Sequence, residues 1–265
     1  MTGLVPSSLR DKDMDARDEP GHDVGDDVQA AEQSFDRLAV IVLGLTGSIG
    51  MGKSTASSML RRLGVPVHDA DAAVHRLIGP GGRALPMVEA AFPGVTGPGG
   101  VDRQRLGAIV FKDPAALRRL ELILHPMVRA DETRFLRRMA ARRAPVVVLD
   151  IPLLYETGGE RRCDAVIVVT APAFLQRARV LRRPGMTEEK LRAILAKQVP
   201  DAEKRRRADF VVDTGQGRRH TLRALANLIR IARGQGSGGP GGRRVGRQNH
   251  ARDRARHRDD RARPE

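Results

Sequence analysis

The residues best suited to chemistry form a glycine-rich run before a predicted helix. The run from Gly47 to Ser54 (GSIGMGKS) fits the pattern G-x-x-x-x-G-K-[ST] and follows an apolar segment that ends at Leu45. Glycines let successive backbone N–H groups turn toward phosphate oxygens, a helix N-terminus adds partial positive charge, and a lysine supplies a point charge. The pattern therefore predicts a nucleoside triphosphate site in a strand–loop–helix unit.

The predicted site extends through the first helical residues after this loop. Lys53 is expected to bind phosphate oxygens, and the Ser54 hydroxyl is expected to hold Mg²⁺. The glycine spacing does not fit G-x-G-x-x-G, which excludes the dinucleotide fingerprint, and the absence of N-K-x-D argues against a GTPase switch. The predicted nucleotide-binding residues are Gly47, Ser48, Ile49, Gly50, Met51, Gly52, Lys53, Ser54 and Thr55.

Two carboxylates follow the next short apolar run. The motif His68-Asp69-Ala70-Asp71 comes directly after Val67, so its two carboxylates are expected at the carboxyl edge of the sheet, on the same side as the glycine-rich loop. In phosphoryl transfer to a hydroxyl group, a carboxylate can orient the attacking oxygen and accept its proton. We predict that Asp71 is this base. The alternative is that Asp71 only caps the following helix.

Asp150 ends a third apolar run, residues 146–150 (VVVLD), in the place of a Walker-B acid. It could reach a metal ion through a water shell, and a structural role at the turn is equally consistent with its position.

Farther along, Arg179 and Arg183 are spaced one helical turn apart. A small lid could bring them to a transferring phosphoryl group, and the alternative is that both are solvated surface arginines.

The elements that must position these residues are short apolar strands that alternate with longer helices. This alternation predicts an α/β fold with a parallel sheet of five strands, at residues 39–45, 65–67, 146–150, 165–169 and 209–213. The predicted helices are residues 54–63, 71–78, 103–111, 114–143 with an interruption at Pro126, 172–182, 187–198 and 218–233. No strand is predicted between residues 71 and 144, so we expect an inserted helical region there that covers the acceptor.

Composition limits the class of protein. The chain has 265 residues but only six Phe, one Tyr and no Trp, so its core must be aliphatic. A single cysteine, Cys163, excludes a disulfide framework and a cysteine-based zinc site. No run approaches the about 18 uncharged apolar residues of a membrane span, and the N-terminus lacks the layout of a signal peptide. We therefore expect a cytoplasmic protein without a membrane segment.

Both ends of the chain are predicted to be disordered. Residues 1–38 are rich in Asp, residues 234–265 are rich in Gly and Arg, and neither segment has enough apolar residues to form a core. The basic excess lies mainly in residues 39–233, which carry 34 basic and 18 acidic side chains (+16), while residues 1–38 contribute −6 and residues 234–265 contribute +5 to the net charge of +15. This charge suits polyphosphate ligands. Aromatic platforms and nucleic-acid motifs are lacking, so no specific nucleic-acid partner is expected. The alternative to an enzyme is a nucleic-acid-binding protein that has a regulatory triphosphate site.

Six segments, in this order, resemble the dephospho-CoA kinase family. They are residues 44–55 (GLTGSIGMGKST), 67–71 (VHDAD) with His75 following, 101–126 (VDRQRLGAIVFKDPAALRRLELILHP), 146–156 (VVVLDIPLLYE), 176–187 (QRARVLRRPGMT) and 198–213, which ends in ADFVVD. The resemblance covers roughly residues 39–232. It implies a three-layer P-loop kinase core at residues 39–233, with a helical CoA-binding insertion at about 79–143 and a small lid at about 176–198.

The resemblance also implies a reaction. It is the ATP-dependent phosphorylation of the ribose 3′-hydroxyl of dephospho-CoA, with Mg²⁺ as the metal and CoA and ADP as products, the final step of coenzyme A biosynthesis. The alternative is a P-loop kinase of another small hydroxylic acceptor, such as a nucleoside or a nucleotide. The implied catalytic residues are Lys53, Asp71, Arg179 and Arg183, the implied acceptor-binding residues are Asp69, Asp71, His75 and His125, and the implied metal residues are Ser54 and Asp150.

The sequence departs from the family pattern at a few positions. Ser48 and Met51 stand where the family usually has glycine or serine. Thr214 replaces the usual asparagine after the last strand, so no adenine contact is assigned to it. Relatives usually begin a few residues before the first strand, and one explanation of residues 1–38 is a true start at Met14 or Val40.

Overall fold

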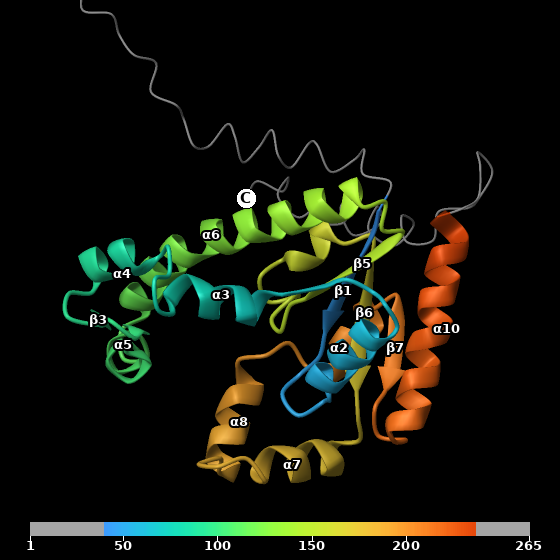
Figure 1. Ribbon diagram of the computed structural model, residues 1–265. Helices are drawn as coiled ribbons and strands as arrows, with labels where there is room; N and C mark the ends of the chain where they lie inside the picture. Colours follow the sequence, from blue (N-terminus) through green and yellow to red (C-terminus); the bar gives the residue numbers. More distant parts are fainter. Residues whose placement is uncertain (1–39, 237–265) are drawn as a thin grey trace, which may run out of the picture. The chain divides into compact units, whose positions relative to one another are not determined.

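The computed structural model describes residues 40–236 of the chain (Figure 1). The two segments predicted to be disordered lie outside the described residues, except for 234–236. Those three residues form the end of helix α10 (Arg218–Gly236), so this helix continues past the predicted boundary at residue 233.

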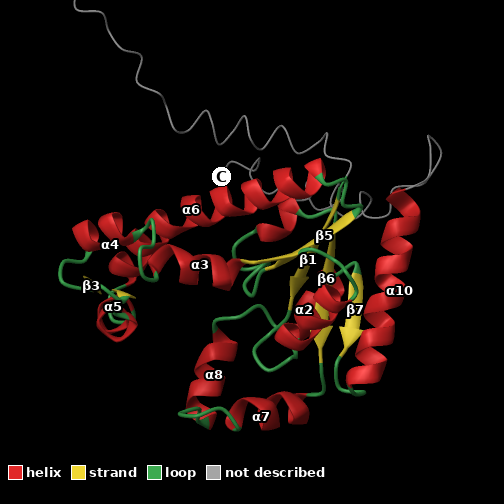
Figure 2. Ribbon diagram, viewed as in Figure 1, coloured by secondary structure: helices red, strands yellow, loops and turns green. Residues whose placement is uncertain are grey.

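A five-stranded parallel sheet lies at the centre of the described chain (Figure 2). Its order is β2–β5–β1–β6–β7, and neighbouring strands pair in parallel. The predicted α/β fold with five parallel strands is confirmed. The strands are β1 (Ile41–Thr46), β2 (Val67–Asp69), β5 (Val146–Asp150), β6 (Ala165–Thr170) and β7 (Phe210–Asp213).

The sheet is covered on one face by α10 and by α2 (Lys53–Arg62), which also contact each other. Alternate residues of the central strands, such as Leu45 and Ile167, pack in one cluster with Leu60 of α2 and Leu225 of α10, and these four side chains are fully buried. Burial of branched aliphatic residues on both sides of a strand is expected for a parallel sheet covered on both faces. The packing of α2 fixes the place where the glycine-rich loop enters the helix.

Strand β2 differs from its prediction because it begins two residues later, at Val67 rather than Val65. Its last two residues are polar, and they pair in register with β5: His68 with Leu149, and Asp69 with Asp150. The prediction relied on apolar residues alone, so it ended the strand before the polar residues His68 and Asp69. The shift matters because it puts Asp69 within the sheet rather than after it.

A second group of helices has its own hydrophobic core. It contains α3 (Ala70–Ile78), α4 (Leu85–Ala91), α5 (Arg103–Val110) and the first half of α6 (Pro114–Ala141). The expectation that no strand occurs between residues 71 and 144 is wrong, because β3 (Thr96–Gly97) and β4 (Gly100–Val101) form a short antiparallel hairpin. Two-residue strands that contain glycine have no alternating apolar pattern, so the sequence did not reveal them. Helix α4 was not predicted either.

The predicted interruption at Pro126 is wrong as well. Helix α6 runs from Pro114 to Ala141 with Pro126 inside it. Proline removes one backbone hydrogen bond and strains the helix. Buried side chains on both sides of it, among them Leu124 and Phe135, nevertheless keep the two halves packed as one helix.

Three helices connect β6 to β7, namely α7 (Ala173–Leu181), α8 (Glu188–Ala196) and α9 (Asp201–Arg207). The sequence did not predict α9, because its residues DAEKRRR are almost all polar. Its position depends on Lys204, which is fully buried and has its Nζ 2.8 Å from Glu156 Oε1. A 3-10 helix (Gly159–Arg162) lies between β5 and β6.

The single cysteine lies in the interior. Cys163 is buried beside β1, where a Cβ atom on Gly44 would come within 2.8 Å of its Sγ. Burial raises the pKa of the Cys163 thiol. None of the helices in residues 40–236 has an apolar stretch long enough to cross a bilayer.

Candidate active site

The loop between β1 and α2, residues 47–52, has the backbone that an anion site needs. Gly50 and Gly52 have φ angles of 78° and 88°, in the left-handed region that favours glycine. At Gly47, an added Cβ would come within 2.7 Å of the Val169 backbone oxygen, so this position also requires glycine. We call residues 47–54 the phosphate loop.

Side chains from other elements hold the carbonyl groups of this loop. Gln176 Nε2 donates to Ile49 O at 2.8 Å, and Thr214 Oγ1 donates to Met51 O at 2.8 Å. A peptide group is planar, with its C=O and N–H on opposite sides, so the N–H groups of Gly50 and Gly52 point away from these partners. Within residues 40–236, neither N–H has a hydrogen-bond partner. Both are therefore available to a phosphate group.

Lys53 and Asp150 form an ion pair beside the phosphate loop. Lys53 Nζ lies 2.7 Å from Asp150 Oδ1, and the side chains are 16% and 2% exposed. Asp150 ends β5, in register with Leu45 of β1 and Asp69 of β2. The parallel sheet thus brings the two predicted residues together, and Asp150 contacts the lysine rather than capping a turn.

Asp69 and Asp71 have different roles at the start of α3. Asp69 is the N-cap, because its Oδ1 accepts the N–H of Ala72 at 2.9 Å, and its Oδ2 lies 3.6 Å from Arg61. The alternative that Asp71 only caps this helix is therefore wrong. Asp71 lies in the first turn, and its side chain is only partly exposed.

Electrostatic interactions connect Asp71 to the phosphate loop. Partial burial raises the pKa of the Asp71 carboxyl, and the neighbouring carboxylates of Asp69 and Asp150 raise it further, whereas Lys53 opposes the rise. A carboxylate with a raised pKa is a stronger proton acceptor than an isolated one. Its surroundings suit a general base.

The two histidines predicted to bind the acceptor lie on different helices. His75 is one turn after Asp71 on α3, and its Nδ1 contacts Arg103 of α5. His125 is exposed on α6. In the described part of the chain His125 has no hydrogen bond or ion pair, and no contact brings it to the phosphate loop.

The two predicted arginines also differ. Arg179 is on α7, and its guanidinium donates to Gly50 O at 3.4 Å, to Thr214 Oγ1 at 3.0 Å and to Thr214 O at 2.9 Å. Arg183 lies beyond the end of α7 at Leu181, so the prediction that both arginines share one helical face is wrong. The Arg183 side chain is exposed and has no partner among residues 40–236.

Three residues around the phosphate loop were missed from the sequence. Gln176 and Thr214 hold loop carbonyls, and Gln198 Oε1 accepts the N–H of Ile49 at 3.2 Å. Thr214 is buried, so it connects the loop to the end of β7 rather than facing a ligand. Gln176 is the first residue of segment 176–187 and Gln198 is the first residue of segment 198–213, two of the segments that carry the family resemblance. This position was the only feature of the sequence that pointed to them.

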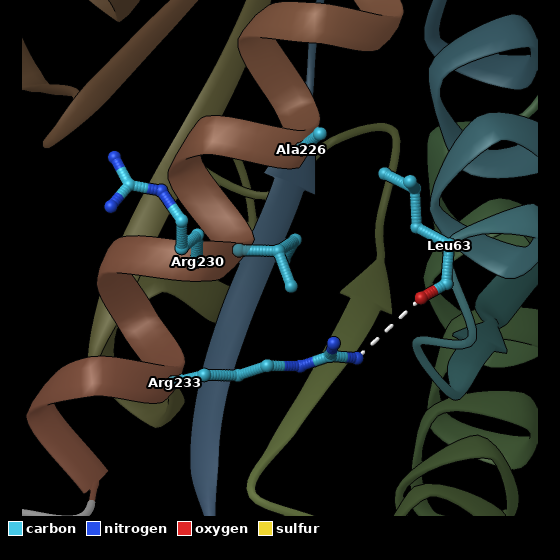
Figure 3. A pocket seen from close by; sticks show the side chains of 5 residues that line it. Leu63, Ala226, Arg230 and Arg233 are labelled. Carbon is cyan, nitrogen blue, oxygen red and sulfur yellow. Dashed lines mark hydrogen bonds between the residues drawn. The ribbon is translucent and has the colours of Figure 1, made fainter.

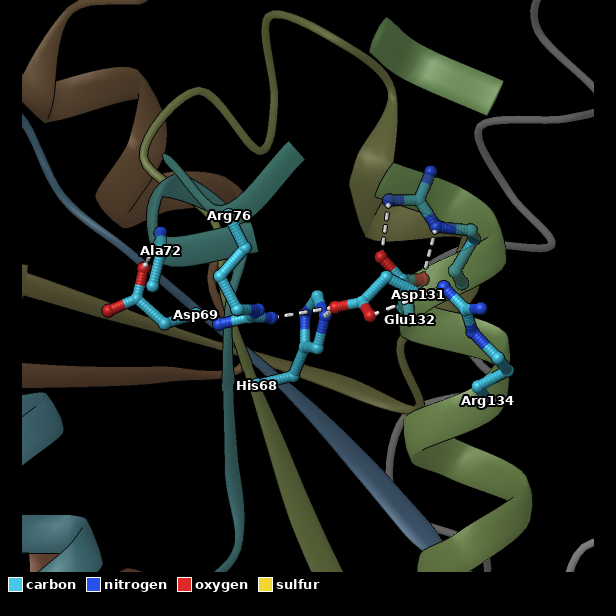
Figure 4. A network of polar contacts seen from close by, with 8 residues as sticks. His68, Asp69, Ala72, Arg76, Asp131, Glu132 and Arg134 are labelled. Atoms are coloured by element: carbon cyan, nitrogen blue, oxygen red, sulfur yellow. Dashed lines mark hydrogen bonds and ion pairs between the residues drawn. The ribbon is translucent and has the colours of Figure 1, made fainter. Parts of the chain in front are cut away.

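A polar network connects β2 and α3 to α6 (Figure 4). The buried His68 has its Nε2 3.1 Å from Asp131 Oδ2, and Arg76 donates to the same oxygen at 2.9 Å. Although burial opposes it, contact with His68 and Arg76 holds the pKa of Asp131 below its usual value. The network fixes the strand that carries Asp69 against the long helix.

The residues present fit Mg²⁺ held mainly through ligand oxygens. No group of three or more His, Cys, Asp or Glu side chains among the described residues could hold a metal ion. Ser54 is exposed at the start of α2, and Asp150 Oδ1 is occupied by Lys53. Mg²⁺ commonly binds through one or two protein ligands, substrate phosphates and water, so this sparse donor set suits it.

Two cavities lie at opposite ends of α2. One, of about 470 Å³, borders the phosphate loop and is lined by Met51, Thr170, Gln176 and Asp213, among others. The other is lined by Leu63, Ala226, Ile229, Arg230 and Arg233, with Arg233 donating to Leu63 O at 3.5 Å (Figure 3). Because Leu63 follows a helix that is about 15 Å long, the second cavity is remote from the phosphate loop.

The parallel sheet, the phosphate loop and the Lys53–Asp150 pair together define a P-loop kinase. The dephospho-CoA kinase family model matches residues 41–219. This chain belongs to the dephospho-CoA kinase family.

Individual relatives agree with this assignment. The dephospho-CoA kinase of Mesorhizobium japonicum is 62% identical over 196 residues, which cover 74% of this chain and 98% of the relative. That of Paramagnetospirillum magneticum is 62% identical over 201 residues, covering 76% and 95%. These matches do not favour the alternative of a nucleoside or nucleotide kinase.

Solved structures show the same fold. A crystal structure from Thermus thermophilus has a TM-score of 0.63 and 36% identity, covering 72% of this chain and 96% of that chain. A dephospho-CoA kinase from Campylobacter jejuni has a TM-score of 0.54 at 24% identity, covering 73% and 98%.

Proposed function

We propose that this protein transfers the terminal phosphoryl group of ATP to the ribose 3′-hydroxyl of dephospho-CoA, which gives CoA and ADP. The family supplies the acceptor. One observation supports the chemistry best. Asp71, whose pKa is raised, interacts electrostatically with both members of the Lys53–Asp150 pair beside the phosphate loop.

In the proposed reaction, Asp71 accepts the proton of the 3′-hydroxyl while that oxygen forms a bond to the γ-phosphorus. The bond between the γ-phosphorus and the β,γ-bridging oxygen breaks, and its electron pair leaves with ADP. The N–H groups of Gly50 and Gly52 bind phosphate oxygens, and Lys53 moves from Asp150 toward them. Arg183 neutralises charge on the transferring group, whereas Arg179 acts by holding the loop.

The Ser54 hydroxyl would ligate Mg²⁺, with Asp150 reaching it through water. When bound, the ion would neutralise phosphate charge. We propose that the acceptor binds to residues 79–143, and that Asp69, His75 and His125 contact it. Residues 176–198 are assigned as the lid. The remaining nucleotide contacts are assigned to Gly47, Ser48, Ile49, Met51 and Thr55, and a cytoplasmic location stays a prediction.

The test is ADP release by the purified protein with ATP, Mg²⁺ and dephospho-CoA, compared with adenosine, AMP and no acceptor. Product mass identifies CoA. We expect CoA formation that depends on dephospho-CoA and falls by about 10²-fold to 10⁴-fold in Asp71→Asn. Turnover that is indifferent to dephospho-CoA would reject the acceptor while leaving the triphosphate site in place.

A further inference from the structure

Two glutamine side chains hold the same residue of the phosphate loop from opposite sides. Gln176 Nε2 donates to the carbonyl oxygen of Ile49 at 2.8 Å, and Gln198 Oε1 accepts the N–H of Ile49 at 3.2 Å. A backbone carbonyl only accepts and a backbone N–H only donates, so the orientation of each glutamine amide is fixed. We call Gln176 and Gln198 the glutamine pair.

The two glutamines stand at the two ends of one segment. Gln176 lies on α7 and is 7% exposed. Gln198 follows α8, and between the two helices lies the turn that carries Arg183. The side chains of α7 and α8 also interact, because Arg177 Nε lies 2.8 Å from Glu188 Oε2. Both ends of residues 176–198 are therefore attached to Ile49 of the phosphate loop, and Arg179 adds a contact to Gly50 O between them.

The Gln198 end is fixed by an ion pair in which the lysine is fully buried and the glutamate is 14% exposed. Glu156 Oε1 accepts the N–H of Val199 at 2.9 Å and lies 2.8 Å from Nζ of Lys204, which is fully buried. The same contact with Lys204, which opposes the effect of burial, holds the pKa of Glu156 below its usual value. The residue directly after Gln198 is thus held in place, so Gln198 is not a loose surface side chain.

The geometry has a direct consequence for phosphate binding. The Ile49 carbonyl and the Gly50 N–H belong to one planar peptide group, so Gln176 sets the direction of that N–H. The Ser48–Ile49 peptide is held in the same way by Gln198. We propose that Gln176 and Gln198 are positioning residues that orient the Ile49 peptide groups and couple residues 176–198 to the phosphate loop. This inference rests on the proposed function only for the statement that the loop binds ATP.

The first test compares Gln176→Met and Gln198→Met, which keep side-chain length and remove the amide. Binding of a non-hydrolysable ATP analogue is measured without acceptor. Each variant is expected to bind the analogue about threefold to tenfold more weakly, as loss of one hydrogen bond predicts, with little change in dephospho-CoA binding. Because both act on one residue, the loss in the double variant should be smaller than the product of the single losses. Gln104→Met, at an exposed position on α5, is the control for analogue binding.

The second test separates the two glutamines by amide hydrogen exchange in the nucleotide-free protein. Only Gln198 covers the Ile49 N–H, so Gln198→Met should speed exchange at Ile49 by about threefold to tenfold, and Gln176→Met should change it less. Equal exchange at Ile49 in all variants, or unchanged analogue binding in both Met variants, would overturn the proposal. Failure to form CoA would reject the acceptor instead, because neither analogue binding nor hydrogen exchange at Ile49, the two measurements that decide the proposal, requires the acceptor.

Discussion

Lys53 Nζ lies 2.7 Å from Asp150 Oδ1, although the two residues are 97 positions apart in the chain. The contact joins the start of α2 to the end of β5. It keeps the lysine charge at the carboxyl edge of the sheet and gives the buried Asp150 a compensating partner. The lysine is thus held beside the phosphate loop before any nucleotide arrives.

Asp150→Asn should weaken both stability and catalysis. The amide oxygen can still accept a hydrogen bond, but the buried ion pair is lost, so we expect the free energy of unfolding to fall by about 1–3 kcal/mol. Because Lys53 is less well oriented, kcat should fall by about tenfold or more. Denaturant unfolding and steady-state kinetics measure the two effects. Asp113→Asn, which keeps its helix cap, is the control, and wild-type values in Asp150→Asn would contradict the role of the pair.

Asp69→Asn should move the acid limb of the pH–rate profile to lower pH. The Asp71 pKa is raised first by burial and further by the Asp69 carboxylate, so removal of that charge lowers it. A base must be deprotonated to act, and a lower pKa keeps it deprotonated at lower pH. Asn still caps α3. The measurement is log kcat against pH; a limb that stays in place or rises would show that Asp71 is not the titrating base.

Arg179 and Arg183 should separate in their effects. Arg179→Met removes contacts to Gly50 and Thr214, so the free energy of unfolding should fall by about 1–2 kcal/mol and ATP should bind more weakly. Arg183→Met should leave unfolding unchanged and lower kcat by about 100-fold. Arg182→Met, at the exposed neighbouring position, is the control for both. Equal loss of kcat in Arg182→Met and Arg183→Met would argue for a general charge effect.

Thr214→Val should raise the KM for ATP. The hydroxyl donates to Met51 O at 2.8 Å, and valine has the same shape without the donor, so the carbonyl is left unpaired. We expect a threefold to tenfold rise in KM, at about 1 kcal/mol for the bond. Thr214→Ser keeps the hydroxyl and should behave like the natural protein. If Ser and Val variants have the same KM, the hydroxyl is not what positions the loop.

Local patterns predicted much of the site, and long-range contacts account for the rest. The phosphate loop, Asp69, Asp71 and Asp150 could be located because each lies at the end of an apolar run or just after it, and parallel strands bring such ends to one edge. The Gln198–Ile49 contact spans 149 positions, and no spacing rule marks it. The continuity of α6 through Pro126 depends on packing, which outweighs a local helix-breaking preference.

The burial of Cys163 makes the natural chain suitable for site-specific labelling. It is the single cysteine among 265 residues, and both its burial and its raised pKa make it a poor nucleophile. A thiol-reactive dye should therefore leave the unmodified protein almost untouched. Cysteines introduced by Arg182→Cys and Ser58→Cys, at two exposed positions, would then carry a fluorophore pair without removal of any native thiol. Energy transfer between the two dyes would report whether the segment with Arg183 changes its distance from α2 when nucleotide binds.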